Sequence, residues 1–143
     1  MTDNKNHKIE VSEEEIIERI EKEGDEATPK TIDNVILHED DIEKKSKRLN
    51  KDKFGKLYKQ VRLALQMIRD FKAKRYTMVP WRTMALISVG ILYFLNPMDI
   101  MPDIIPILGL TDDAIALAAI FKSIQSDLKL YCEWRGLDLD EYF

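Results

Sequence analysis

The feature of this sequence that most constrains its fold is a run of sixteen residues without a charge, from Thr83 to Met98. A helix of that length extends about 24 Å, whereas the hydrocarbon core of a bilayer is about 30 Å thick. A full membrane span is therefore disfavoured, and we expect either a globular helical core or a hairpin only partly immersed in lipid. Pro80 precedes the run, where a first helical turn tolerates a proline, and Asn96-Pro97 ends it.

After this run, several residues that interrupt helical structure occur before a last helix begins. Thr111 predicts the start of that helix and Gly136 its end, because these residue types favour the two kinds of cap. The last helix carries a hydrophobic stripe made of Ile115, Ala118, Phe121, Ile124, Leu128 and Tyr131. The residues that break the chain are Asp99, Pro102, Asp103, Pro106 and Gly109. The sequence thus predicts a Pro/Asp-rich helical hairpin at residues 96–113.

A basic amphipathic helix is predicted upstream of Pro80. Its apolar residues recur at helical spacing, and its lysines and arginines fall away from that stripe. The stripe consists of Phe54, Leu57, Tyr58, Val61, Ala64, Leu65, Ile68 and Phe71. No stretch of any length shows the alternation typical of a strand, so we expect an all-α protein, a small helical bundle.

Charge is strongly segregated along the chain. Residues 1–50 carry 9 Lys/Arg and 15 Asp/Glu, residues 51–82 carry 10 and 2, and residues 83–143 carry 3 and 9. A basic block of this density suits nucleic acid or anionic lipid. The whole chain has a formal net charge of −4 and shows no nucleic-acid-binding motif, so we expect no nucleic acid partner.

The first fifty residues are predicted to be an acidic, partly disordered helical arm. A short helix begins at Ser12 and stops at Gly24, and it has too few apolar residues to be stable alone. Residues 24–31 are expected to be a linker, and a charged helix follows from Asp40 to Asn50.

We therefore divide the chain into a mobile arm at 1–50, a helical domain at 51–136 and a C-terminal tail at 137–143. Removing the arm is expected to leave the domain folded. The alternative is that the arm completes the core through Ile32, Val35, Ile36 and Leu37.

Residues 93–114, YFLNPMDIMPDIIPILGLTDDA, closely resemble the core signature of the YkvA-like family, a bacterial domain of unknown function of the DUF1232 type. The resemblance extends over about residues 55–130. It implies a compact helical module that is often predicted to be membrane-associated, with no established activity, substrate or cofactor. The structural positions of the signature are Asn96, Pro97, Pro102, Pro106, Gly109 and Thr111.

The hairpin contains four carboxylates, from Asp99, Asp103, Asp112 and Asp113. One interpretation is that they converge as oxygen ligands for Mg²⁺, Mn²⁺ or Ca²⁺. A simpler one is that Asp103 caps a short helical turn, while Asp112 and Asp113 lie in the first helical turn after Thr111, where the helix dipole favours carboxylates. A third is that they pair with cations, because an unpaired carboxylate is costly in apolar surroundings. The cations considered are Arg69, Lys74, Arg75 and Arg82.

Catalytic chemistry is not favoured by this sequence. His7 and His38, the only histidines, lie in the arm, and neither a glycine-rich phosphate loop nor a Cys/His metal motif is present. No resident cofactor is expected. Cys132, the only cysteine, excludes an intramolecular disulfide, and the N-terminus lacks an apolar signal region. We therefore expect a cytoplasmic protein, with membrane association as an added property.

The leading hypothesis is a non-catalytic interaction or scaffold module, peripheral to an anionic membrane surface or to a membrane protein. Trp81 and Met84 are the apolar residues that we expect to remain exposed for this contact. Self-association through the hairpin is the alternative if lipid does not bind. A second hypothesis is a divalent-metal-dependent activity, or a metal-stabilised fold, that uses the four aspartates.

Overall fold

The computed structural model describes residues 13–100 and 110–143. Within these residues all regular secondary structure is helical, which confirms the predicted all-α class. The helices are α1 (Glu13–Asp25), α2 (Pro29–Leu37), α3 (Glu39–Lys47), α4 (Lys51–Lys72), α5 (Trp81–Leu95), α6 (Pro97–Ile100), α7 (Leu110–Ser123), α8 (Gln125–Trp134) and α9 (Leu139–Tyr142).

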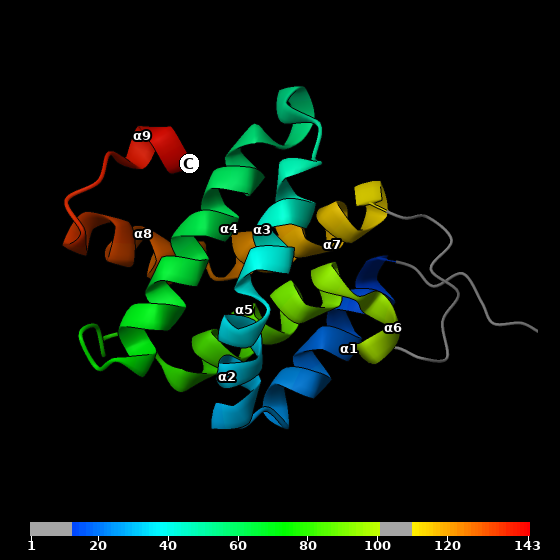
Figure 1. The fold of residues 1–143 in the computed structure, drawn as a ribbon, viewed down its shortest axis with the longest axis horizontal. Helices are drawn as coiled ribbons and strands as arrows, with labels where there is room; N and C mark the ends of the chain where they lie inside the picture. The colour runs from blue at the N-terminus through cyan, green and yellow to red at the C-terminus, as the bar shows by residue number, and fades with distance from the viewer. Residues whose placement is uncertain (1–12, 101–109) are drawn as a thin grey trace, which may run out of the picture.

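The uncharged run forms α5, which lies in the middle of the molecule (Figure 1). Eleven of its fifteen residues are buried, as expected of a helix that is apolar on all sides. It packs against α1, α2, α3, α4, α6 and α7. The run is therefore the central core helix. No helix in the described ranges has both the length and the apolar character that crossing a bilayer requires.

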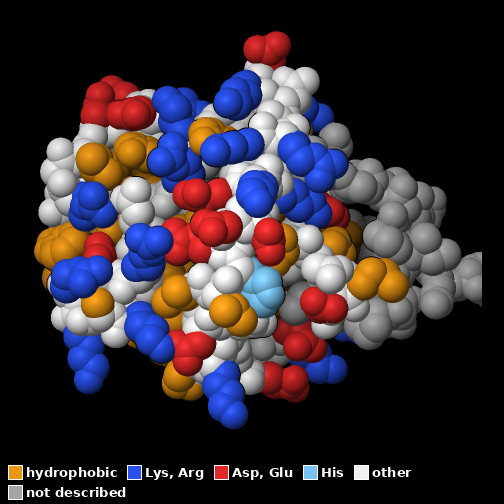
Figure 2. Space-filling view, in the orientation of Figure 1, with side chains coloured by type: hydrophobic (Ala, Val, Ile, Leu, Met, Phe, Trp, Pro, Cys, Tyr) orange, Lys and Arg blue, Asp and Glu red, His pale blue; other side chains and the backbone are white. Residues whose placement is uncertain are grey.

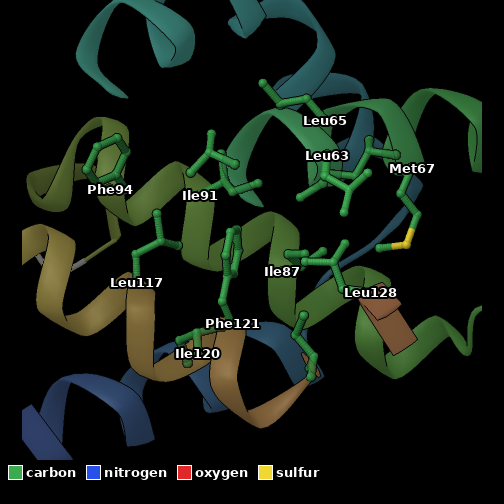
Figure 3. Close-up of a cluster of buried hydrophobic side chains, with 14 of the residues drawn as sticks. Leu63, Leu65, Met67, Ile87, Ile91, Phe94, Leu117, Ile120, Phe121 and Leu128 are labelled. Carbon is green, nitrogen blue, oxygen red and sulfur yellow. The ribbon is translucent and has the colours of Figure 1, made fainter. Parts of the chain in front are cut away.

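The core is formed where α4, α5, α7 and α8 meet (Figure 3). Figure 3 shows Phe121 of α7 and Leu128 of α8 beside Ile87 of α5, with Leu63 of α4 above them in this view. Gly90 allows close packing of α7 on α5, because an added Cβ there would lie 3.3 Å from an Ile120 side-chain carbon. The predicted stripe of α4 is confirmed, with only Tyr58 and Phe71 left partly exposed.

The last predicted helix is divided into α7 and α8 by a break at Ile124. The Ser123 hydroxyl donates to the Ile120 carbonyl at 2.6 Å, a side-chain bond that competes with the helical backbone pattern. The break lets α8 pack on α4. Gly136 ends this region with a φ of +73°, as predicted, and the expected tail contains α9, which also packs on α4.

The arm differs most from its prediction. The described part of it, residues 13–50, forms α1, α2 and α3, and these helices pack on α4 and α5 instead of docking loosely. The predicted linker is reduced to a short turn after α1, where Thr28 begins α2 with a capping box. Short helices that are marginal alone become stable when they share a core. The shared core residues are Ile20, Ile32, Val35, Ile42 and Leu49.

Candidate functional site

The turn between α4 and α5 has an unusual backbone conformation. Lys74 has a φ of +63°, and among the described residues it is the one non-glycine with positive φ. The Arg75 amide donates to the Asp70 carbonyl at 2.8 Å and closes the end of α4. Glycine is the usual residue at such a position, and another residue there costs about 1 kcal/mol or more.

Asp70 anchors this turn to α8. Its carboxylate accepts hydrogen bonds from Arg75 Nε at 2.8 Å and from the Tyr131 hydroxyl at 2.5 Å. Arg135 donates to the same hydroxyl at 3.0 Å. Tyr76, from the turn, packs its ring against Tyr131 and Trp134, with centroid distances of 5.0 and 4.9 Å. The turn is therefore a fixed platform.

The electrostatics of this anchor follow from its burial and its partners. Burial alone raises the pKa of Asp70, but hydrogen bonds from Tyr131 and Arg75 and the nearby guanidinium charges outweigh it, so the pKa lies below its usual value. Burial, together with the hydrogen bond to Asp70, raises the pKa of Tyr131 to about 12. The carboxylate is thus ionised and the phenol neutral at neutral pH.

The outer side of the turn combines exposed apolar and cationic side chains. Met78 is 67% exposed and Trp81 is 40% exposed. Residues 71–82 hold four lysines and arginines and no acidic residue, and all four cations are exposed. Figure 2 shows blue and orange side chains together at the lower left, where Figure 1 places this turn. We call the surface of Lys72, Lys74, Arg75, Met78, Trp81 and Arg82 the α4–α5 corner.

The corner was only partly foreseen from the sequence. Trp81 is exposed as expected, but Met84 is fully buried, because it lies on α5 inside the core. Met78, in the turn, is the exposed methionine instead. The sequence signal that singles out residues 71–82 is the absence of acidic residues between four cations.

The hairpin residues that the structure describes have structural roles. The Asn96 side chain accepts from the Met98 amide at 3.3 Å and donates to the exposed Asp99 carboxylate at 3.2 Å, at the start of α6. Pro97 is the first residue of α6. Pro102, Asp103, Pro106 and Gly109 lie outside the described residues. So do the side chains of Thr111 and Asp112, whose backbone belongs to α7.

Asp113 is buried and pairs with Lys45 of α3, with Nζ and Oδ2 3.2 Å apart. The same ammonium donates to the carbonyl of Phe94 at 2.6 Å, at the end of α5. Lys45 thus joins the C-terminal end of α5 to the first turns of α7. The dipole of α5 favours the ammonium at its C-terminal end, and the dipole of α7 favours the Asp113 carboxylate near its N-terminal end. No pattern in the sequence identified this lysine, which lies in the predicted arm.

The arginines proposed as partners of the hairpin aspartates pair elsewhere. Their distances to carboxylate oxygens are 2.8 Å for Arg69 and Glu39, 2.8 Å for Arg75 and Asp70, and 3.7 Å for Arg82 and Asp25. For the described aspartates of the hairpin, the predicted pairing is therefore wrong. Arg69 lies in α4, Arg75 in the turn after it and Arg82 at the start of α5, and their partners belong to α3, α4 and α1.

The described residues contain no group of three or more His, Cys, Asp or Glu arranged to hold a metal ion. Asp99 and Asp113 have the protein partners given above, and the other two hairpin carboxylates lie outside the described side chains. A metal site in the hairpin therefore stays a prediction. Burial raises the pKa of the Cys132 thiol, so this cysteine is a core residue with little thiolate at neutral pH.

Comparison with known proteins gives two matches. The family described as "Protein of unknown function (DUF1232)" matches residues 83–119, which cover most of α5 and the first part of α7. The chain is also 40% identical over 70 residues to a protein of Bacillus subtilis (strain 168) described as "Uncharacterized membrane protein YkvA". That alignment covers 49% of this chain and 66% of the relative, slightly less than two thirds of its length.

No solved structure matches this chain. The family match overlaps the central helices and includes the Asn96-Pro97 signature that ends α5. On these findings, the family match at residues 83–119 and the 40% identity to the YkvA relative support placing this part of the chain in a YkvA-like DUF1232 family.

Proposed function

We propose that this protein is a non-catalytic interaction module that docks on the surface of an anionic membrane through the α4–α5 corner. The observation that carries the proposal is the exposure of Met78 and Trp81 on a rigid turn that is otherwise cationic. Tryptophan favours the interface between headgroups and acyl chains, and each nearby Lys or Arg adds about 1 kcal/mol of attraction to an anionic leaflet.

The ion pairs at the corner leave its cations available to lipid headgroups. Lys72 pairs with Asp33 and Arg82 with Asp25, and all four side chains are at least half exposed. Exposed pairs of this kind contribute at most about 1 kcal/mol, so phosphate groups can compete with the carboxylates. Arg75 is different, because its partner Asp70 is buried and holds the turn in place.

The name of the Bacillus subtilis relative is consistent with a membrane location. A peripheral mode fits this chain better than a spanning one, because α5 is enclosed by other helices. Self-association through the hairpin remains the alternative, and it has no support from the described residues.

Flotation with lipid vesicles tests the proposal. Vesicles with a large fraction of phosphatidylglycerol should carry the full-length protein at low salt, and binding should weaken at high salt because the charges are screened. Vesicles of phosphatidylcholine alone should bind much less. Substituting both Met78→Ala and Trp81→Ala should weaken binding by roughly 10- to 100-fold, since two apolar side chains lose their lipid contacts.

The matched control is Leu37→Ala, which removes an apolar side chain that is 77% exposed but lies outside the corner. Equal losses for this variant and for the corner variant would contradict the assignment of the surface. Absence of any flotation on anionic vesicles would contradict the proposal itself. Tighter binding of a DNA duplex than of anionic vesicles, lost in the same corner variant, would assign the surface to nucleic acid instead.

A further inference from the structure

An apolar groove of about 500 Å³ lies beside the corner, between the start of α2 and the turn that joins α4 to α5. Its volume is within the range of small-molecule binding sites. The rings of Phe71 and Trp81 lie side by side in its wall, with centroids 6.4 Å apart. The lining residues are Pro29, Ile32, Asp33, Phe71, Lys72, Lys74, Thr77 and Trp81.

The charged residues of this groove favour an anion. Lys72 is paired with Asp33, whereas Lys74 is exposed and takes part in no ion pair within the described residues. The net charge of the lining is therefore +1, beside the further cations Arg75 and Arg82. An occupant that fits has an apolar chain for the aromatic wall and a negative group for the lysine.

A second groove on the same molecule serves as an internal comparison. It measures about 620 Å³ and lies between α2, the end of α1 and the middle of α5. Three carboxylates line it, from Glu23, Glu26 and Asp33, against the single cation Lys30. An anionic ligand is repelled there, so size alone does not select the groove at the corner.

The backbone at Lys74 adds an independent reason to assign it a role. A glycine would hold the positive φ of this position without strain, yet the sequence has a lysine. Backbone strain of this kind is retained where a side chain is needed. Here the strained residue places an unpaired ammonium beside an apolar groove.

We propose that this groove binds one acyl chain of an anionic lipid, with the headgroup at Lys74 and the chain against Phe71 and Trp81. The inference rests on the proposed membrane docking and adds a specific lipid site to it. The protein would then recognise individual anionic lipid molecules. This site would contribute more to the affinity than the general attraction of the basic surface to the bilayer.

The key variant is Lys74→Gly, because folding and binding should respond in opposite directions. Relief of the backbone strain should raise the melting temperature by roughly 2 to 4 °C. Loss of the cation should weaken binding to phosphatidylglycerol vesicles about fivefold. The matched control is Lys59→Ala, which removes an exposed cation from α4 outside the corner.

Contact with the chain is measured by fluorescence in a Trp134→Phe variant, in which Trp81 is the one remaining tryptophan. Phosphatidylglycerol with brominated acyl chains should quench Trp81, and Lys74→Gly in that background should reduce the quenching at equal protein concentration. A medium-chain fatty acid below its micelle concentration should also shift the Trp81 emission. The corresponding alcohol should act more weakly, and inorganic phosphate alone should have no effect.

The outcomes separate the two proposals. Failure to float on any anionic vesicle overturns the membrane function together with this site. Flotation with unquenched Trp81, or with equal losses for Lys74→Gly and Lys59→Ala, overturns the lipid site and leaves surface docking intact. Quenching that is independent of headgroup charge also overturns the site, because the lysine then has no role.

Discussion

Replacing Ile20 with alanine tests whether the described arm is part of the core. Ile20 lies in α1 and is fully buried, whereas Leu37, in the same predicted arm, is 77% exposed. An independent arm predicts that neither Ile20→Ala nor Leu37→Ala changes the stability of the domain. The packing of α1 on α5 predicts that only the first substitution does.

The magnitude follows from the side chain that is lost. The substitution removes three carbons, each contributing about 0.8 kcal/mol, and the cavity that remains adds to this cost. We expect a decrease of about 2 to 4 kcal/mol in the free energy of unfolding, which lowers the melting temperature by roughly 5 to 15 °C. Leu37→Ala should change the free energy of unfolding by less than about 0.5 kcal/mol.

The assay is urea unfolding followed by circular dichroism, with the slope m compared between variants so that a change in midpoint reports stability. A midpoint for Ile20→Ala within error of that for Leu37→Ala would refute the reasoning. A chain that begins at Asn50 provides a second reading. It lacks five buried aliphatic side chains. Burial of each stabilises a folded protein by about 1.5 to 3 kcal/mol, so their loss removes about 8 to 15 kcal/mol, as much as the whole free energy of unfolding of a typical domain. We therefore expect no cooperative melting transition.

Three further predictions concern the described contacts, and a fourth concerns the hairpin aspartates. The pKa of Asp70 is lower in the folded protein than its unfolded value of 3.8. The stability that the Asp70 carboxylate contributes is therefore complete above pH 3.8 and is lost as the pH falls through the folded pKa. Asp70→Asn should flatten the acid side of a pH–stability curve. Because the pKa of Tyr131 is raised to about 12, stability should decline as the pH rises from 10 towards 12. Tyr131→Phe should reduce that decline, and it should cost about 1.5 to 3 kcal/mol at neutral pH. Lys45→Met should destabilise by about 2 to 4 kcal/mol in thermal melts, with partial recovery in the double variant that adds Asp113→Asn; an undisturbed single variant would contradict the described pair. If the hairpin aspartates bind a divalent cation, Mg²⁺, Mn²⁺ or Ca²⁺ should raise the melting temperature and a chelator should reverse the rise; no shift with any of them excludes the site.

Features that depend on neighbours within a few residues were predicted well. The uncharged run gave the position of α5, the apolar spacing gave the inner face of α4, and Asn96-Pro97 gave the end of α5. Gly136 has the positive φ expected of a helix stop. Periodicity and caps act within one or two helical turns, so they can be recognised from the order of residues alone.

Features that depend on residues far away in the sequence were not predicted. Lys45 meets Asp113 although 68 positions separate them, and Asp70 meets Tyr131 across 61 positions. Many donor side chains of this chain could bind either aspartate, so only the packing of the helices selects Lys45 for one and Tyr131 for the other. The arm is the largest case, because its short helices are weak by themselves and its few apolar residues give no sign of where they pack. The sequence by itself determined the positions of α1, α4 and α5 and the apolar face of α4, but it did not identify α2. The tertiary structure decided that α1, α2 and α3 cover α5, because burial of apolar surface is a property of the assembled helices and of no single one.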